Sequence, residues 1–273
     1  MNYRHAFHAG NFADLQKHAI VLALLKALTA EETPLSVIDT HGGAGAYDLG
    51  GDMALRSGEA AAGIGRLLAM DDVPAVFAPL VAAAKALNGR GQGSLYPGSP
   101  LLVAGALRKT DRYTACELRP DDFDSLRRTL APYAFAQAVK DDGYATAVAR
   151  AGKGGRTFVL IDPPFERSDD YAQTVAATKA VLAKDKDAVI AAWMPLKDLE
   201  TFDAFMRAME TVTNDALAAE LRLRPLTDPM KMNGCAMVMV GAPKSTEGAI
   251  AEITTWLADN LGDAGAKARI WRA

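Results

Sequence analysis

The stretch TFVLIDPPF, residues 157–165, decides the fold. Its apolar run, Phe158 to Ile161, is typical of a strand that is buried on both faces of a parallel sheet. Asp162 ends this strand, and two prolines, which lack N–H groups, stiffen the turn that follows. Open α/β sheets bind ligands at the carboxyl ends of their strands. The stretch therefore predicts an α/β protein with a functional site at this turn.

The same turn carries groups suited to a flat amine. The Asp162 carboxylate and the carbonyl of Pro163 form two convergent acceptors, which match an NH2 group that must donate two hydrogen bonds. Phe165 supplies an apolar face on which a base can stack. The alternative is a stiff turn after a core strand with no chemistry. We take Asp162, Pro163 and Phe165 as candidate catalytic residues.

Working outward, short apolar runs recur between longer helical stretches. They lie at 35–39, 112–118, 135–139, 188–196, 219–225 and 235–243. With the run in 157–165 they predict a seven-stranded, mainly parallel sheet. Helices are expected over 168–184, over about 198–211 and after Ser245. The last two runs are joined by a polar loop without a helix, which predicts an antiparallel hairpin at the sheet edge.

One interval is too long for a simple crossover. The first strand ends at Asp39 and the second at Glu117, whereas one crossover helix needs only about 20–25 residues between strand ends. Pro97 to Pro100 opens a helix before the second strand, with Ser99 as its expected N-cap. Residues 48–96, with helical periodicity, remain as an inserted helical subdomain in a main domain of 1–47 and 97–273. The insertion either helps to hold the substrate or only stabilises the fold.

Composition excludes several classes of protein. Half of the residues are hydrophobic and 23% are charged, as in an ordinary globular chain. The net charge of −3 excludes a surface-wide attraction to nucleic acid but not a local basic patch. Cys116 and Cys235 have neither the C-x-x-C nor the zinc-ligand spacing, so we expect buried, reduced thiols and no metal site. No apolar stretch approaches the ~18 residues of a membrane span, and we expect a cytoplasmic protein.

The ends of three further predicted strands carry polar or glycine-rich loops. VIDTHGGAG, residues 37–45, matches neither a dinucleotide fingerprint nor a P-loop, but Gly43 allows a close backbone approach to a ligand. Glu117 can accept the two ribose hydroxyls of an adenosine-containing ligand. Asp142, followed by Gly143, can accept a hydrogen bond from the adenine amine. Taken singly, each also fits a tight turn or a solvated carboxylate.

Together these four elements resemble the S-adenosylmethionine-dependent amino-methyltransferases, which carry [DNS]-P-P-[YFW] after the fourth strand. The resemblance implies a Rossmann-like class I methyltransferase fold, S-adenosyl-L-methionine as cofactor, and in-line methyl transfer to an amine. His41 departs from the glycine or phenylalanine that many members have in the first loop, and we expect it to pack over the cofactor.

A closer resemblance covers essentially the whole chain. The segment YRHAFHAGN, residues 3–11, with Asp14, Lys17 and His18, is similar to the RlmJ family of bacterial adenine-N6 methyltransferases of large-subunit (23S) ribosomal RNA. The match continues through residues 39–41, 96–100 and 162–164. Phe165 in place of the frequent tyrosine, Gly42 and Phe12 are departures. Phenylalanine keeps the stacking face, so the departures put little in doubt.

This resemblance implies roles for individual residues. Cofactor contacts are expected at His18, His41, Gly43, Ser99, Glu117, Asp142 and Gly143. Tyr3 is expected against the target base, which must be extruded or lie in a loop. Arg4, His5 and Lys17, in the same short segment, are expected to face the RNA. The alternatives without function are that His18 and His41 are core or capping residues and that the basic segment is a solvated helix start.

Three other functions compete with N6-methylation of 23S ribosomal RNA by a monomer. The same turn serves methylation of DNA adenine, guanine-N2 or protein glutamine. A nucleotide-binding oxidoreductase is disfavoured because the G-x-G-x-x-G fingerprint is missing. A non-catalytic RNA-binding assembly factor would not need Asp162 or Glu117.

Overall fold

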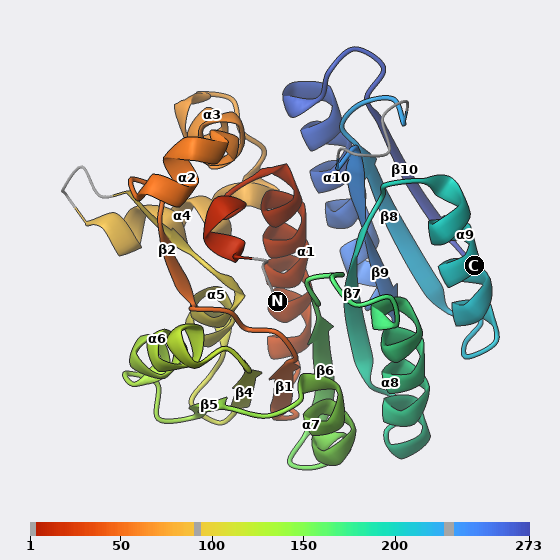
Figure 1. The fold of residues 1–273 in the computed structure, drawn as a ribbon. Coiled ribbons are helices and arrows are strands. Elements are labelled where there is room, and N and C mark those ends of the chain that lie inside the picture. The colour runs from red at the N-terminus through yellow and green to blue at the C-terminus, as the bar shows by residue number, and fades with distance from the viewer. Residues whose placement is uncertain (1–3, 90–93, 227–231) are drawn as a thin grey trace.

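The sheet runs through the whole molecule in the computed structural model, which describes residues 4–89, 94–226 and 232–273 (Figure 1). Among these residues, eight strands are hydrogen-bonded in the order β10-β8-β9-β7-β6-β1-β4-β5. The strands are β1 (Leu35–Asp39), β4 (Arg112–Cys116), β5 (Ala136–Val139), β6 (Arg156–Ile161), β7 (Val189–Pro195), β8 (Ala216–Arg222), β9 (Gly234–Val240) and β10 (Lys267–Arg272).

Parallel pairing joins β5, β4, β1, β6 and β7, so the carboxyl ends of these strands share one edge of the sheet. All seven predicted strands are present, and β8 and β9 form the predicted antiparallel pair. The prediction that this pair forms the sheet edge is wrong. β9 also pairs with β7, and β10, an eighth strand, covers β8. β10 alternates charged and apolar residues (KARIWR) and is half exposed, so it lacks the apolar run by which the others were found.

Helices cover both faces of the sheet. One face carries α1 (Phe12–Thr29), α5 (Ser99–Ala106), α6 (Pro120–Leu130) and α10 (Glu247–Leu261), whose buried side chains join one core cluster. The other face carries α7 (Gly143–Arg150), α8 (Asp170–Lys184) and α9 (Leu199–Glu210), with a second core cluster. The predicted helices are confirmed. None of the helices within the described ranges is both long and apolar enough to cross a membrane.

Helix α1 brings its first turns to the carboxyl edge of the sheet. The side chain of its N-cap, Asn11, accepts hydrogen bonds from the backbone N–H groups of Ala13 and Asp14. The helix is buried on almost every side, and it packs against α5 and α10. As a result Asp14, Lys17 and His18 lie inside the molecule next to the ends of β1 and β6.

The long interval between β1 and β4 contains further helices. Strands β2 (Ala46–Asp48) and β3 (Leu95–Pro97) pair at its two ends, and between them lie α2 (Asp52–Ser57), a π-helical turn, α3 (Arg66–Ala69) and α4 (Ala78–Asn88). The buried Ile64, Phe77 and Leu80 belong to the same core cluster as α1. These helices therefore share a core with the main sheet. The division into two domains stays a prediction.

Candidate active site

A cleft of about 310 Å³ opens at the carboxyl ends of β1, β4, β5 and β6. Most predicted site residues meet there. The cleft is lined by Arg4, His5, Lys17, His18, His41, Gly43, Ser99, Glu117, Asp142, Gly143, Asp162 and Pro163, among others. Tyr3 lies outside the described residues. Phe165 is absent from the lining, because its ring packs against Tyr171 and Trp193.

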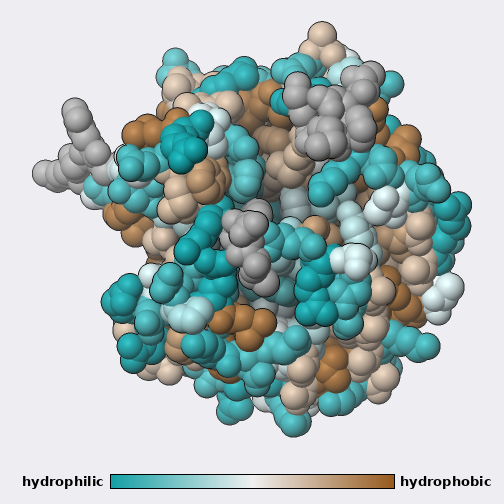
Figure 2. All heavy atoms as spheres, in the orientation of Figure 1, coloured by the Kyte–Doolittle hydropathy of each residue, from teal (hydrophilic) through white to brown (hydrophobic). Residues whose placement is uncertain are grey.

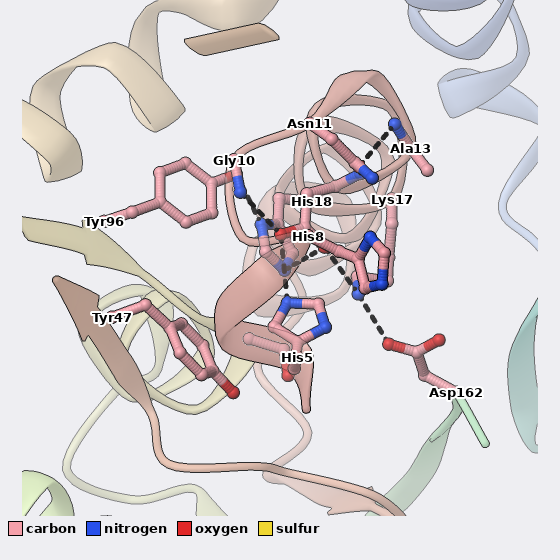
Figure 3. A network of polar contacts seen from close by, with 12 residues as sticks. His5, His8, Gly10, Asn11, Ala13, Lys17, His18, Tyr47, Tyr96 and Asp162 are labelled. Carbon is pink, nitrogen blue, oxygen red and sulfur yellow. Dashed lines mark hydrogen bonds and ion pairs between the residues drawn. The ribbon is translucent and has the colours of Figure 1, made fainter. Parts of the chain in front are cut away.

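The central ion pair of the cleft joins Lys17 to Asp162 (Figure 3). The Lys17 Nζ atom lies 2.5 Å from Oδ2 of Asp162 and 2.9 Å from Oδ1 of Asp14. Burial alone would lower the pKa of Lys17, but the two carboxylates outweigh it and hold that pKa well above its usual value. A permanently charged ammonium group therefore stands beside the carboxylate of the Pro-Pro turn.

Asp14 organises the surroundings of this pair. Its Oδ2 atom accepts hydrogen bonds from the backbone N–H of Gly10 at 2.9 Å and from Nε2 of His5 at 3.1 Å. Burial would raise the pKa of Asp14, yet the nearby His5, Lys17 and His18 hold it well below its usual value. One buried anion thus fixes the N-terminal segment and the lysine together.

Lys17 does not face RNA as the sequence analysis expected. Its side chain is only 5% exposed, and both of its partners are carboxylates inside the cleft. The expectation was wrong because a lysine in an amphipathic segment is usually solvated, whereas α1 is buried on almost every side. Lys17 is therefore a buried counter-ion rather than a phosphate contact.

His18 is a neutral imidazole. It is almost fully buried, and its Nδ1 atom lies 2.8 Å from the hydroxyl of Tyr96 in β3. Burial lowers the pKa of His18 to about 3. At neutral pH it therefore offers one donor and one acceptor and no charge.

Asp39 lies behind the cleft at the end of β1. It accepts hydrogen bonds from the hydroxyls of Ser99 at 2.7 Å and Tyr113 at 3.1 Å. Burial raises the pKa of Asp39 to about 6. Ser99 is the first residue of α5 and Gly98 is its N-cap, which corrects the expected cap by one residue. The Ser99 side chain is directed to Asp39 instead of to the helix.

Glu117 ties the first loop to the second strand. Its Oε2 atom accepts a hydrogen bond from the N–H of Gly43 at 3.0 Å, and Oε1 accepts one from the N–H of Arg119 at 2.7 Å. Gly43 has a φ of 61°, which favours glycine. Burial raises the pKa of Glu117. The loop and the acid are thus held next to each other in the lining of the cleft.

The far end of the cleft is formed where α7 begins. The Asp142 side chain caps this helix by accepting a hydrogen bond from the N–H of Ala145 at 2.8 Å. A Cβ atom on Gly143 would lie 1.9 Å from the carbonyl oxygen of Thr40, so only glycine allows this approach. His41 lines the cleft beside them with its ring edge-on to Tyr144, and burial lowers the pKa of His41 to about 4.

Several functional neighbours escaped the sequence analysis as members of the site. Asp14 and Tyr96 each bind a predicted site residue directly, and Tyr113 binds Asp39, which in turn binds the predicted Ser99. Asp14 could have been found from the sequence, because it stands three and four positions before Lys17 and His18 and therefore lies on the same helix face. The two tyrosines could not, since each meets its partner only through the tertiary fold.

Comparison with known proteins identifies the family of the chain. The family model described as "Ribosomal RNA large subunit methyltransferase D, RlmJ" matches residues 32–273. The chain belongs to this family. It is 33% identical over 267 residues to ribosomal RNA large subunit methyltransferase J of Escherichia coli K12, covering 97% of this chain and 95% of the relative. It is 34% identical to the protein of the same name from Haemophilus influenzae, covering 96% and 94%.

A solved structure shares the whole fold. Protein LPL1258 of Legionella pneumophila superposes with a TM-score of 0.91 at 28% identity, covering 97% of this chain and 98% of that one. The fold is therefore the expected Rossmann-like class I methyltransferase fold, and the chain is a methyltransferase of an rRNA-modifying family. Family membership excludes the oxidoreductase alternative.

Cys116 lines the cleft, but burial raises the pKa of its thiol to about 12, so the thiol stays protonated.

Proposed function

We propose that this protein transfers the methyl group of S-adenosyl-L-methionine to N6 of an adenine in 23S ribosomal RNA. The observation that carries the proposal is the position of Asp162. Its carboxylate ends β6, stands on the Pro-Pro turn and opens into the cleft that Glu117 and Gly43 share. An acceptor at that turn suits an amine, and the family supports ribosomal RNA as the substrate.

The described residues fit an adenosine-containing cofactor. Glu117 lines the cleft with a carboxylate that can accept ribose hydroxyls, and Asp142 lines the same cleft with a carboxylate that can accept a hydrogen bond from the adenine amine. The cleft of about 310 Å³ lies within the usual range of small-molecule sites. When bound, S-adenosylmethionine would supply an activated methyl group on a positively charged sulfur.

At the reacting end, the chain positions the amine. Lys17 binds Oδ2 of Asp162, so we assign Oδ1 and the Pro163 carbonyl as acceptors for the two amine hydrogens. Accepting both hydrogens favours a tetrahedral nitrogen and directs its lone pair at the methyl group. Catalysis then rests on positioning and electrostatics. The proton released from the amine passes to Asp162 or to water.

The substrate adenine has to leave its stack to enter this cleft. Enzymes that act on a base extrude it from a duplex or bind it in a loop.

Because the proposed substrate is ribosomal RNA, we place the protein in the cytoplasm. We further propose that it acts as a monomer. Sedimentation velocity of the free protein tests the oligomeric state.

Methylation of RNA from a strain that lacks the protein tests the proposal. The protein is incubated with labelled S-adenosylmethionine and either that RNA or DNA from the same strain, and the product nucleosides are identified by mass spectrometry. We expect labelled N6-methyladenosine in the 23S fraction and none with RNA from the parent strain. Labelled N2-methylguanosine, or unlabelled RNA together with labelled DNA, would reject the adenine-in-RNA assignment.

A further inference from the structure

Among the residues that the structure describes, three arginines line the cleft, and each is paired with an aspartate of the same chain. Arg4 of the N-terminal segment lies 3.8 Å from Asp121. The side chain of Arg119, at the start of α6, lies 3.1 Å from Asp122. The third, between β6 and α8, binds its partner at 2.8 Å in the pair Arg167–Asp169. The three arginines come from three separate elements and surround one opening.

The Arg167 pair shows the geometry most clearly. Nε donates to one Asp169 oxygen at 2.9 Å and Nη2 donates to the other at 2.8 Å. Its side chain is 62% exposed. The hydrogen bonds from Arg167 lower the pKa of Asp169 to about 2. A guanidinium fork that holds two carboxylate oxygens is equally shaped for two phosphate oxygens. The aspartate thus occupies the position that a phosphate group would take.

The proposed cofactor does not account for three guanidinium groups. S-adenosylmethionine carries one carboxylate, and its sulfonium is itself positive. The family's substrate, in contrast, is a polyanion with one charge on every nucleotide. Figure 2 shows hydrophilic side chains across the middle of the face that it presents.

We propose that Arg4, Arg119 and Arg167 form the surface that binds the phosphates next to the extruded adenine, and that their aspartate partners occupy this surface in the free protein. This inference rests on the proposed function and adds to it the residues that contact the RNA backbone. RNA binding is then an exchange of partners, in which phosphates replace carboxylates.

Exchange is feasible because ion pairs at the surface are weak: the Arg4 and Arg167 pairs are exposed, and the Arg119 pair is partly exposed. A pair of this kind typically changes an equilibrium by less than about fivefold. Each phosphate contact releases condensed counterions, so the slope of log affinity against log salt reports the number of contacts. An acidic protein can thus bind RNA locally without a basic surface overall.

Salt-dependent binding of an unmethylated 23S RNA transcript tests the inference, with S-adenosylhomocysteine present so that no turnover occurs. Arg119→Gln and Arg167→Gln should each reduce the slope by about 0.7–0.9, the value of one phosphate contact. Asp122→Asn and Asp169→Asn should raise the affinity about two- to fivefold at low salt, because they remove a competitor.

Helix α6 offers a matched control. Arg127 lies 3.9 Å from Asp124 with the same spacing of three residues as Arg119 and Asp122, but neither lines the cleft. Arg127→Gln and Asp124→Asn should leave slope and affinity close to wild type. They also measure how much a change of net charge contributes by itself.

The outcomes separate the surface from the function. If wild type methylates the transcript while the Arg119 and Arg167 variants show the same salt slope and affinity as the Arg127 control, the proposed phosphate-binding surface is wrong and the proposed function stands. If Arg119→Gln weakens binding of S-adenosylhomocysteine and leaves the salt slope unchanged, Arg119 belongs to the cofactor site and the surface is also wrong. If wild type neither binds nor methylates the transcript, both proposals fail.

Discussion

The ammonium group of Lys17 lies 2.5 Å from the carboxylate of Asp162, across 145 residues of sequence. The contact joins a helix that precedes the first strand to the turn that follows β6. It is part-buried, and it shares Lys17 with Asp14. The group proposed to receive the substrate amine is therefore held by a cation that comes from outside the sheet.

Replacement of Asp162 tests the reacting end of the cleft. Asp162→Ala should lower kcat about 10²–10³-fold, because it removes an acceptor aimed at the amine. Asp162→Asn should retain more activity, since its carbonyl still accepts one hydrogen bond. Single-turnover methylation of 23S RNA measures both. Wild-type rates in the alanine variant would show that the active site is elsewhere.

Removal of Lys17 should destabilise the protein at neutral pH. Lys17→Met leaves the buried carboxylate of Asp14 and the part-buried carboxylate of Asp162 without their cation. Breaking a buried pair costs about 3–5 kcal/mol of the free energy of unfolding. Urea unfolding at pH 7 measures the loss, and Lys26→Met, an exposed position on the same helix, is the control.

The pH dependence of this loss follows from the two shifts. The pKa of Asp14 is depressed, so its stabilisation is present above the ordinary aspartate pKa and disappears as the pH falls through the depressed value. The pKa of Lys17 is raised, so its contribution is complete below the ordinary lysine pKa and disappears at higher pH. The difference between Lys17→Met and wild type should shrink in acid. A pH-independent difference would contradict the ion-pair account.

Cofactor affinity should depend on the protonation of Glu117. Burial raises its pKa, so the carboxylate accepts ribose hydroxyls above that pKa and loses this capacity as the pH falls through it. Titration calorimetry with S-adenosylhomocysteine should show weaker binding in acid. Glu117→Gln should bind more weakly by about 1.5–3 kcal/mol at pH 7 and lose the pH dependence. Equal pH profiles for variant and wild type would remove Glu117 from the cofactor site.

Phe165 tests whether base stacking holds the substrate. Its ring contacts Tyr171 and Trp193 rather than lining the cleft, and its φ is 50°. Phe165→Tyr should be tolerated because the ring is kept. Phe165→Ala should raise the KM for RNA, with a loss of about 1–3 kcal/mol if the ring stacks on a base. An unchanged KM would assign Phe165 to packing alone.

The sequence predicted those parts of the site that follow strand ends. Asp162 and Glu117 could be placed because each comes directly after a strand, and Asp142 because it follows the end of β5 by three residues; parallel strands bring such ends together. The environment of Lys17 could not be predicted, because its burial depends on α10 and β9, which lie more than 200 residues later. For the same reason, Tyr96 and Tyr113 could be recognised as partners only in the folded chain.

The packing of α1 against α10 has a consequence for the kinetics of folding. Gln16 of α1 donates a hydrogen bond to Thr254 of α10, 238 residues away. Contacts of such long sequence separation form late, because a large loop must close first. Helix α1 is made before its neighbours, and the part of its apolar surface that packs against α10 stays exposed until α10 is present. Methyl transfer should thus appear in the slowest refolding phase, when Lys17 reaches Asp162, and not when the sheet forms. Until then α1 offers chaperones an exposed apolar surface.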